Sequence, residues 1–212
     1  HGALDNCPWD VLGYRYDYYS EIITLMFKSL GVNLKDLEIV KGSDFQLKKE
    51  YIFDVLKMST FCTVNDCKRA ASEVVKFGDN PKLSGLIYPI MQSLDEEYLG
   101  VDVQYGGLDQ RKILMFAREQ LPKLGYRRRI EFMTPLRPGL HEGGKMSSSV
   151  KGSKIDLLDS PEDVSKKISG AFCPEGVVEG NGVLAFLKYV VMVYKGDKKK
   201  EFVVKRDKKF GG

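Results

Sequence analysis

The 212-residue sequence is poor in the side chains that bind metals or build disulfide frameworks. It has two histidines, His1 and His141, and four cysteines that form no Cys-x-x-Cys pair. This scarcity argues against a structural zinc site and against a small secreted domain held by disulfides. We therefore expect a reduced, cytoplasmic protein without a protein-bound metal.

Long hydrophobic runs are missing too. No apolar stretch approaches the length of about 20 residues that a transmembrane helix needs. The first residues do not form a signal peptide, and the chain starts at His1 without a methionine. We expect no membrane association, and we interpret the abrupt start as the interior of a longer protein.

Charge of one sign is not in large excess, since the net charge is +4, and the hydrophobic fraction of 43% is ordinary for a globular protein. A chain of this length can form one large domain and part of a second. The basic residues nevertheless cluster at 127–129, 198–200 and 205–209. Such clusters suit a phosphate backbone, but solvated turns have the same composition, so the charge alone leaves both readings open.

The stretch from Gly143 to Ser149, Gly-Gly-Lys-Met-Ser-Ser-Ser, has the composition of a polyphosphate-binding loop. Its glycines let the backbone approach a ligand closely, while Lys145 and the serine hydroxyls suit phosphate oxygens. Met146 would anchor such a loop by burial. A flexible linker between domains has the same composition, so this stretch alone fits either role.

A second candidate site follows residues 101–105, which alternate between apolar and polar as in a strand. The glycines at 106–107 then lead into a helix predicted over 108–121. This order places backbone amides and a helix N-terminus at the carboxyl edge of a sheet, where open α/β sheets bind ligands. Asp109 suits sugar hydroxyls there, and Gln110 suits an ammonium group.

A helix that Pro89 opens is predicted just before this strand. Tyr88, Gln92 and Asp95 then lie at i, i+4 and i+7, on one face beside an apolar stripe. Such a helix can pack against a sheet and present three polar groups to a pocket. The alternatives are a polar flank that faces water and, for Asp95, a helix-capping role.

The remaining pattern alternates helices with short strands. Ser43 and Asp44 are expected to cap a helix, and Ser160 with Pro161 and Asp163 forms a capping box. Helices are predicted over 8–30, 46–58, 63–75, 161–171 and 181–192, and strands over 37–40, 101–105, 130–133 and 201–204.

Residues Lys145 to Ser149 resemble the KMSKS motif of class I aminoacyl-tRNA synthetases, in the KMSSS form of tyrosyl-tRNA synthetases of the archaeal and eukaryotic type. Residues 88–95 and 106–112 fall where that family has its amino-acid and ribose pockets. The likeness covers essentially the whole chain. It implies an α/β fold, in which residues 1–149 form part of a Rossmann-type catalytic domain with parallel strands and a helical insertion. Residues 150–212 would begin a mainly helical anticodon-binding domain.

The resemblance also implies roles for single residues. Tyr88, Gln92 and Gln110 would hold the α-amino group of L-tyrosine, and Asp95 would accept a hydrogen bond from the substrate phenol. Phenylalanine would leave that acceptor unpaired. Sites of this kind reject the analogue by about 10⁴ to 10⁵, a magnitude for which tyrosyl-tRNA synthetases are themselves a standard example.

The nucleotide and RNA contacts follow from the same resemblance. Catalysis would rest on Lys145, Ser147 and Ser148; ATP binding on Gly107, Asp109, Met146 and Ser149; and tRNA binding on Arg69, Arg111 and Phe210. Mg²⁺ is expected to arrive with ATP. The expected partners are L-tyrosine, tRNA(Tyr) and a second copy in a homodimer.

The HIGH motif that class I synthetases need is missing from this chain. His141 to Gly144 echo it only superficially, because they precede the phosphate loop instead of opening a helix after a strand. We interpret the chain as an incomplete segment that is inactive alone; a degenerate or split protein is the other explanation. Tryptophanyl-tRNA synthetase and a non-catalytic, synthetase-derived RNA-binding protein are the alternative functions.

Overall fold

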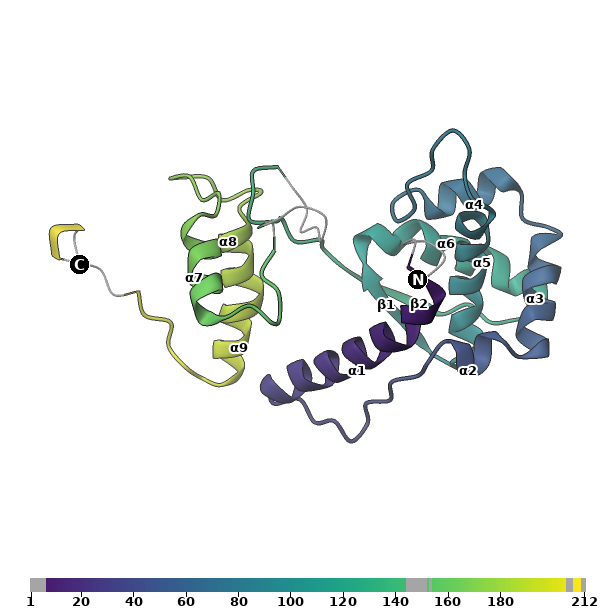
Figure 1. Ribbon diagram of the computed structural model, residues 1–212, viewed down its shortest axis with the longest axis horizontal. Helices are drawn as coiled ribbons and strands as arrows, with labels where there is room; N and C mark the ends of the chain where they lie inside the picture. The colour runs from purple at the N-terminus through teal and green to yellow at the C-terminus, as the bar shows by residue number, and fades with distance from the viewer. Residues whose placement is uncertain (1–6, 144–151, 153, 205–207, 211–212) are drawn as a thin grey trace. The chain divides into compact units, whose positions relative to one another are not determined.

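The computed structural model describes residues 7–143, 152, 154–204 and 208–210. The chain divides into two compact units, residues 1–135 and 136–212, which are described separately. Their elements are labelled in Figure 1. The domain boundary predicted at 149–150 stays a prediction.

The first unit contains a small parallel sheet. Strands β1 (Val103–Gly107) and β2 (Ile130–Thr134) pair in parallel along their whole length. The connection between them runs through the 3₁₀ turn η2 (Leu108–Gln110), helix α6 (Arg111–Gln120) and the 3₁₀ turn η3 (Leu121–Leu124). The predicted strands 101–105 and 130–133 are therefore confirmed with slightly shifted ends, and so is the α/β class.

The glycines after the predicted strand have a different place from the one expected. Gly106 and Gly107 are the last residues of β1, and η2 forms the turn into α6. A Cβ atom on Gly106 would lie 3.3 Å from both Cβ and Cγ of Gln110. The missing side chain therefore lets Gln110 fold back over the end of the strand.

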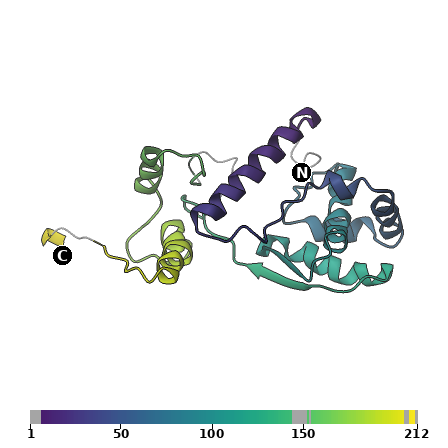
Figure 2. The same cartoon turned by 90° about the horizontal axis from the view of Figure 1, so that it is seen from below.

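Helices cover one side of the sheet. Helix α5 (Leu83–Tyr98) packs against α3 (Lys49–Ser59), α4 (Val64–Ala71) and α6, and Figures 1 and 2 show it among them. The core lies between these helices and includes Tyr51, Met58, Leu94, Ile113 and Leu121, all fully buried.

The other face of the sheet is open in the part of the chain that the structure describes. Tyr105 and Phe132 are exposed there, and their rings stack with centroids 5.9 Å apart. The side chains of Gln104 and Glu131 lie on the covered face and are half-buried. The alternation of exposed and covered positions matches the period of two that a strand imposes.

Local signals account for several helix ends. Helix α4 begins with a capping box, in which the Asp66 amide donates to Thr63 Oγ1 and the Thr63 amide donates to Asp66 Oδ2, each at 3.1 Å. Helix α1 (Leu12–Ser29) follows the short turn η1 (Trp9–Val11). It ends two residues before Gly31, whose φ of +78° is the left-handed conformation that ends helices. The predicted end of this helix is confirmed.

Two expectations about helix starts are wrong. Pro89 lies inside α5, which begins at Leu83, so the ring removes a backbone donor in mid-helix. Burial of Pro89 and its neighbour Ile90 in the core outweighs this local cost. Helix α2 (Ser43–Gln46) is a single turn, and Ser43 stands inside it without making a side-chain capping bond.

Two predicted strands are also wrong. Residues 37–40 and 201–204 have no regular structure. Both are short apolar runs, and an apolar run becomes a strand only when a neighbour supplies hydrogen bonds. Within the described residues, only β1 and β2 pair.

The described part of the second unit is helical. Helix α7 (Pro161–Ser169) begins at the predicted Ser160 cap, whose Oγ accepts from the Asp163 amide at 3.1 Å. Asn181 caps the next helix, and its Oδ1 accepts from the Leu184 amide at 3.1 Å. That helix runs as α8 (Gly182–Phe186), a π-helical stretch η4 (Leu187–Val191) and α9 (Met192–Asp197), and η5 (Lys208–Phe210) follows. None of the described helices is long and apolar enough to cross a membrane.

Candidate active site

Helix α5 carries three of the predicted substrate residues, Tyr88, Gln92 and Asp95. The fourth, Gln110, is the last residue of η2. Gln92 Nε2 donates to Gln110 Oε1 at 3.1 Å, so the structure brings these two side chains together from separate elements. Gly106 leaves room for the Gln110 side chain, since a Cβ atom there would lie 3.3 Å from it.

Gln92 retains an unused acceptor. Its Oε1 is buried, and no donor from the described residues reaches it. A buried carbonyl oxygen without a hydrogen bond costs about 1–3 kcal/mol, so such an atom in a native protein calls for a partner. An ammonium group is a donor of the required kind.

Asp95 is held through one of its two oxygens. Oδ1 accepts from Gln46 Nε2 at 2.9 Å and from the Tyr51 hydroxyl at 2.8 Å. No described residue bonds Oδ2. Burial raises the pKa of Asp95, and the hydrogen bonds from Gln46 and Tyr51 oppose that rise. The side chain bonds other side chains and caps no helix.

Neither Gln46 nor Tyr51 was predicted as a site residue. They lie on α2 and α3, 49 and 44 residues before Asp95. No local pattern connects positions this far apart, and the residues look like ordinary members of two helices. Only the packing of α2 and α3 on α5 brings them to Asp95.

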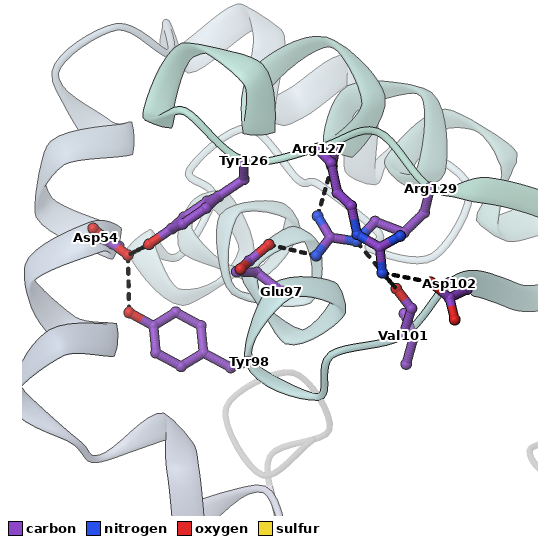
Figure 3. A network of polar contacts seen from close by, with 8 residues as sticks. All are labelled: Asp54, Glu97, Tyr98, Val101, Asp102, Tyr126, Arg127 and Arg129. Carbon is purple, nitrogen blue, oxygen red and sulfur yellow. Dashed lines mark hydrogen bonds and ion pairs between the residues drawn. The ribbon is translucent and has the colours of Figure 1, made fainter.

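A second carboxylate lies between the same two helices. Figure 3 shows Asp54 of α3, which is buried and accepts hydrogen bonds from the hydroxyls of Tyr98 and Tyr126 on Oδ2. Lys57 approaches Oδ1 at 3.4 Å. Burial and then the hydrogen bond to Asp54 raise the pKa of Tyr98, and the hydrogen bond to Asp54 and then burial raise the pKa of Tyr126, so both hydroxyls stay protonated.

An arginine fastens the end of α5 to the sheet. Arg129, which is buried just before β2, pairs with Glu97 of α5 and donates Nε to the Val101 carbonyl at 3.3 Å. Arg127 Nη2 bonds Asp102 at 2.5 Å and the Val101 carbonyl at 3.2 Å. These bonds fix where α5 ends relative to β1 and β2.

Two further carboxyl groups have buried oxygen atoms that no described residue bonds. Both oxygens of Glu96 and both of Glu131 lack a hydrogen bond from any described residue. Burial first, and then the charge of Glu131, raises the pKa of Glu96 to about 8, while Arg129 opposes the rise. Burial also raises the pKa of Glu131 against the attraction of Arg118 and Arg129.

Only two of the predicted nucleotide-binding residues, Gly107 and Asp109, are among the described residues. Gly107 ends β1 and Asp109 lies in η2, both half-buried at the carboxyl edge of the sheet. The other predicted residues, Lys145, Met146, Ser147, Ser148 and Ser149, lie outside the described residues. No group of three or more His, Cys, Asp or Glu side chains in the described part could hold a metal ion.

The predicted tRNA residues are on the surface of the first unit, except Phe210. Arg69 lies on α4, where its Nη2 pairs with Asp66 at 3.0 Å, and Arg111 is the exposed first residue of α6. Lys112 bonds Ser72 at 2.8 Å, which ties α6 to the end of α4 and brings both arginines onto neighbouring helices. Phe210 falls in η5, and its side chain lies outside the description.

Comparisons with known proteins match this chain to aminoacyl-tRNA synthetases over nearly its whole length. A family profile described as "tRNA synthetases class I (W and Y)" matches residues 4–210. The cytoplasmic tyrosine--tRNA ligase of Xenopus laevis is 54% identical over all of this chain and 40% of its own length. The cytoplasmic tyrosine--tRNA ligase of Saccharomyces cerevisiae is 48% identical over all of this chain and 55% of its own length. The chain thus spans about half the length of such relatives.

Solved structures of tyrosyl-tRNA synthetases also match this chain. The crystal structure of a tyrosyl-tRNA synthetase from Archaeoglobus fulgidus complexed with L-tyrosine matches with a TM-score of 0.87 and 42% identity. The match covers 99% of this chain and 63% of that one. A tryptophanyl-tRNA synthetase from Giardia lamblia, at 17% identity and a TM-score of 0.56, shares the fold alone.

Proposed function

The chain belongs to the class I tRNA synthetases of the tryptophan and tyrosine family, and from this membership we propose that the complete protein is a tyrosyl-tRNA synthetase. It activates L-tyrosine with ATP to tyrosyl-adenylate and transfers the tyrosyl group to tRNA(Tyr). The observation that carries this proposal is the state of Asp95. One oxygen is fixed by two protein donors, and the other is left for a donor such as a phenol.

The amino end of the substrate has a matching place. The unused buried Oε1 of Gln92 suits the α-ammonium group of tyrosine, with Gln110 bonded beside it and Tyr88 one turn earlier on α5. The distance along α5 from Gln92 to Asp95 is three residues, or about 4.5 Å of helix rise. Both residues therefore lie within one turn of the same helix, and in this proposal one amino acid reaches both.

The chemistry needs no protein nucleophile. The tyrosine carboxylate attacks the α-phosphorus of ATP, an oxygen–phosphorus bond forms, and pyrophosphate leaves with the electrons of the broken bond. The ribose hydroxyl of the tRNA then displaces AMP from the carbonyl carbon. In this proposal Gly107 and Asp109 bind the nucleotide at the strand edge, and Lys145, Met146, Ser147, Ser148 and Ser149 form the phosphate-binding loop.

Magnesium would accompany ATP and neutralise charge on its phosphates. Mg²⁺ usually keeps several waters and binds through substrate phosphates and one or two carboxylates. This chain's own part is to position the reactants.

The proposed partners follow from the family membership. Arg69, Arg111 and the aromatic ring of Phe210 would contact tRNA(Tyr). A homodimer is supported by α3, where Ile52, Phe53 and Leu56 are exposed. A cytoplasmic location is supported by the names of the relatives from Xenopus laevis and Saccharomyces cerevisiae.

Pyrophosphate exchange by the complete protein tests the function. We expect tyrosine to stimulate exchange of pyrophosphate into ATP, and tryptophan and phenylalanine to leave it near background. An indole N–H is also a donor for Asp95, so exchange with tryptophan but not tyrosine would favour the tryptophanyl alternative. Absence of exchange with all three amino acids, together with retained tRNA binding, would favour the non-catalytic alternative.

A further inference from the structure

The hydrogen bond from the Tyr51 hydroxyl to Asp95 Oδ1 can explain how Asp95 is oriented to bind a substrate hydroxyl. We propose that Tyr51 is a positioning residue for amino-acid specificity: together with Gln46 it immobilises Oδ1 of Asp95 and so aims Oδ2 at the hydroxyl of an aromatic substrate. This inference rests on the proposed function. It adds a specificity residue on α3 that acts through Asp95 and is not one of the predicted pocket residues.

The first step is the orientation of the carboxylate. A free aspartate side chain rotates about its last torsion, so either oxygen can face a ligand. Here two donors from two different elements, Gln46 of α2 and Tyr51 of α3, meet on the same oxygen at 2.9 and 2.8 Å. Rotation would break both bonds, and the remaining oxygen is therefore presented in one direction.

The second step is the rigidity of the donor. Tyr51 is fully buried, and its ring makes edge contacts with two others, Phe45 at 5.8 Å and Tyr98 at 4.8 Å between centroids. A fully buried ring with such neighbours cannot change rotamer without disturbing the core. The hydroxyl is thus a fixed point from which the carboxylate is oriented.

The third step is the direction of the hydrogen bond. The Tyr51 hydroxyl lies 2.8 Å from Asp95 Oδ1 and 2.8 Å from the carbonyl oxygen of Met91, one turn earlier on α5. Burial and the charge of Asp95 raise the pKa of Tyr51, so the hydroxyl keeps its single proton. An ionised carboxylate attracts that proton more strongly than a carbonyl does, and donation to Asp95 follows.

The chain offers a matched control. Tyr98 also donates its hydroxyl at 2.8 Å to a carboxylate across the contact between α3 and α5, from α5 to Asp54. Both tyrosine–aspartate pairs are 44 residues apart in sequence. The difference is that Asp54 receives protein groups on both oxygens, whereas Asp95 receives them on one.

The test compares Tyr51→Phe with Tyr98→Phe in the complete enzyme, by pyrophosphate exchange with tyrosine and with phenylalanine. For Tyr51→Phe we expect kcat/KM for tyrosine to fall about 10- to 100-fold, which is the factor for a hydrogen bond to a charged group. The loss should appear mainly in the KM for tyrosine, and the KM for ATP should not change. Because phenylalanine does not use Oδ2, its kcat/KM should change little, and the tyrosine-to-phenylalanine ratio should fall by the same factor.

Tyr98→Phe should lower the thermal midpoint by an amount similar to Tyr51→Phe and leave the ratio unchanged. Equal effects of the two variants on the ratio, or a lower midpoint for Tyr51→Phe with no change in ratio, would overturn this inference alone. A wild-type enzyme without tyrosine-dependent exchange would overturn the proposed function as well. If Tyr51→Phe does not fold, Gln46→Leu serves instead, with a smaller fall in the same ratio expected and an unchanged ratio counting against the inference.

Discussion

Glu96 provides a pH-dependent prediction whose size follows from its surroundings. This residue is 1% exposed on α5, faces the carboxyl group of Glu131 and has no hydrogen-bond donor within the described residues. Its pKa is raised from 4.5 to about 8, mainly because burial disfavours the charged form. The folded protein therefore prefers Glu96 protonated, and the unfolded chain does not.

The sign of the effect follows from that difference. A group whose pKa is higher in the folded state stabilises the fold fully below its unfolded value, here about 4.5, and the contribution is lost as the pH rises through about 8. At about 1.4 kcal/mol per pKa unit, the loss is at most about 5 kcal/mol. Arg129 and the shared titration with Glu131 reduce it.

The substitution Glu96→Gln removes the titrating group and keeps the shape of the side chain. We expect the variant to be more stable than the wild type at pH 8.5, by a few kcal/mol in the free energy of unfolding. At pH 5 the difference should be small or reversed. Thermal midpoints of the complete protein, measured at both pH values, give the comparison.

The neighbouring Glu97 is the control, because Glu97→Gln makes the same chemical change one residue away. Glu97 pairs with the buried Arg129, so its loss should lower the midpoint at both pH values. The reasoning is refuted if Glu96→Gln is less stable than the wild type at pH 8.5. It is refuted equally if both glutamine variants show the same pH dependence.

Three further predictions concern activity and assembly of the complete enzyme. Asp95→Asn should lower kcat/KM for tyrosine roughly 10- to 100-fold in pyrophosphate exchange with an unchanged KM for ATP, and an equal loss for both substrates would contradict its role in tyrosine recognition. Lys145→Ala should slow adenylate formation in single-turnover measurements much more than it weakens tyrosine binding; equal losses would argue against charge stabilisation on the phosphates. Phe53→Asp, which puts a charge on the exposed face of α3, should shift the protein from dimer to monomer in sedimentation, and an intact dimer would exclude this face.

Local periodicity in the sequence predicts which of the candidate residues share an element. Tyr88, Gln92 and Asp95 share a helix, as their spacing requires, and the strand, glycines and following helix bring Gln110 to Gln92. The contact of Tyr51 with Asp95 is not predictable from the sequence, because the two positions are 44 residues apart and no local spacing rule connects them.

The errors in the fold have the same origin. Pro89 was expected to open a helix because its ring suits a first turn, yet the core buries it in mid-helix. Residues 37–40 and 201–204 have the composition of strands, but a strand is defined by its neighbour. Local sequence preference limits the secondary structures that a segment can adopt, and tertiary packing selects among them.

The contrast between the two carboxylates of the α3–α5 contact separates a binding role from a structural one. Asp54 has Tyr98 and Tyr126 on one oxygen and Lys57 on the other, so the protein itself satisfies both. Asp95 has both of its protein donors on Oδ1, and no described residue donates to Oδ2. We therefore expect Oδ2 to be the oxygen that accepts from the substrate, and in the proposed function that donor is an aromatic hydroxyl.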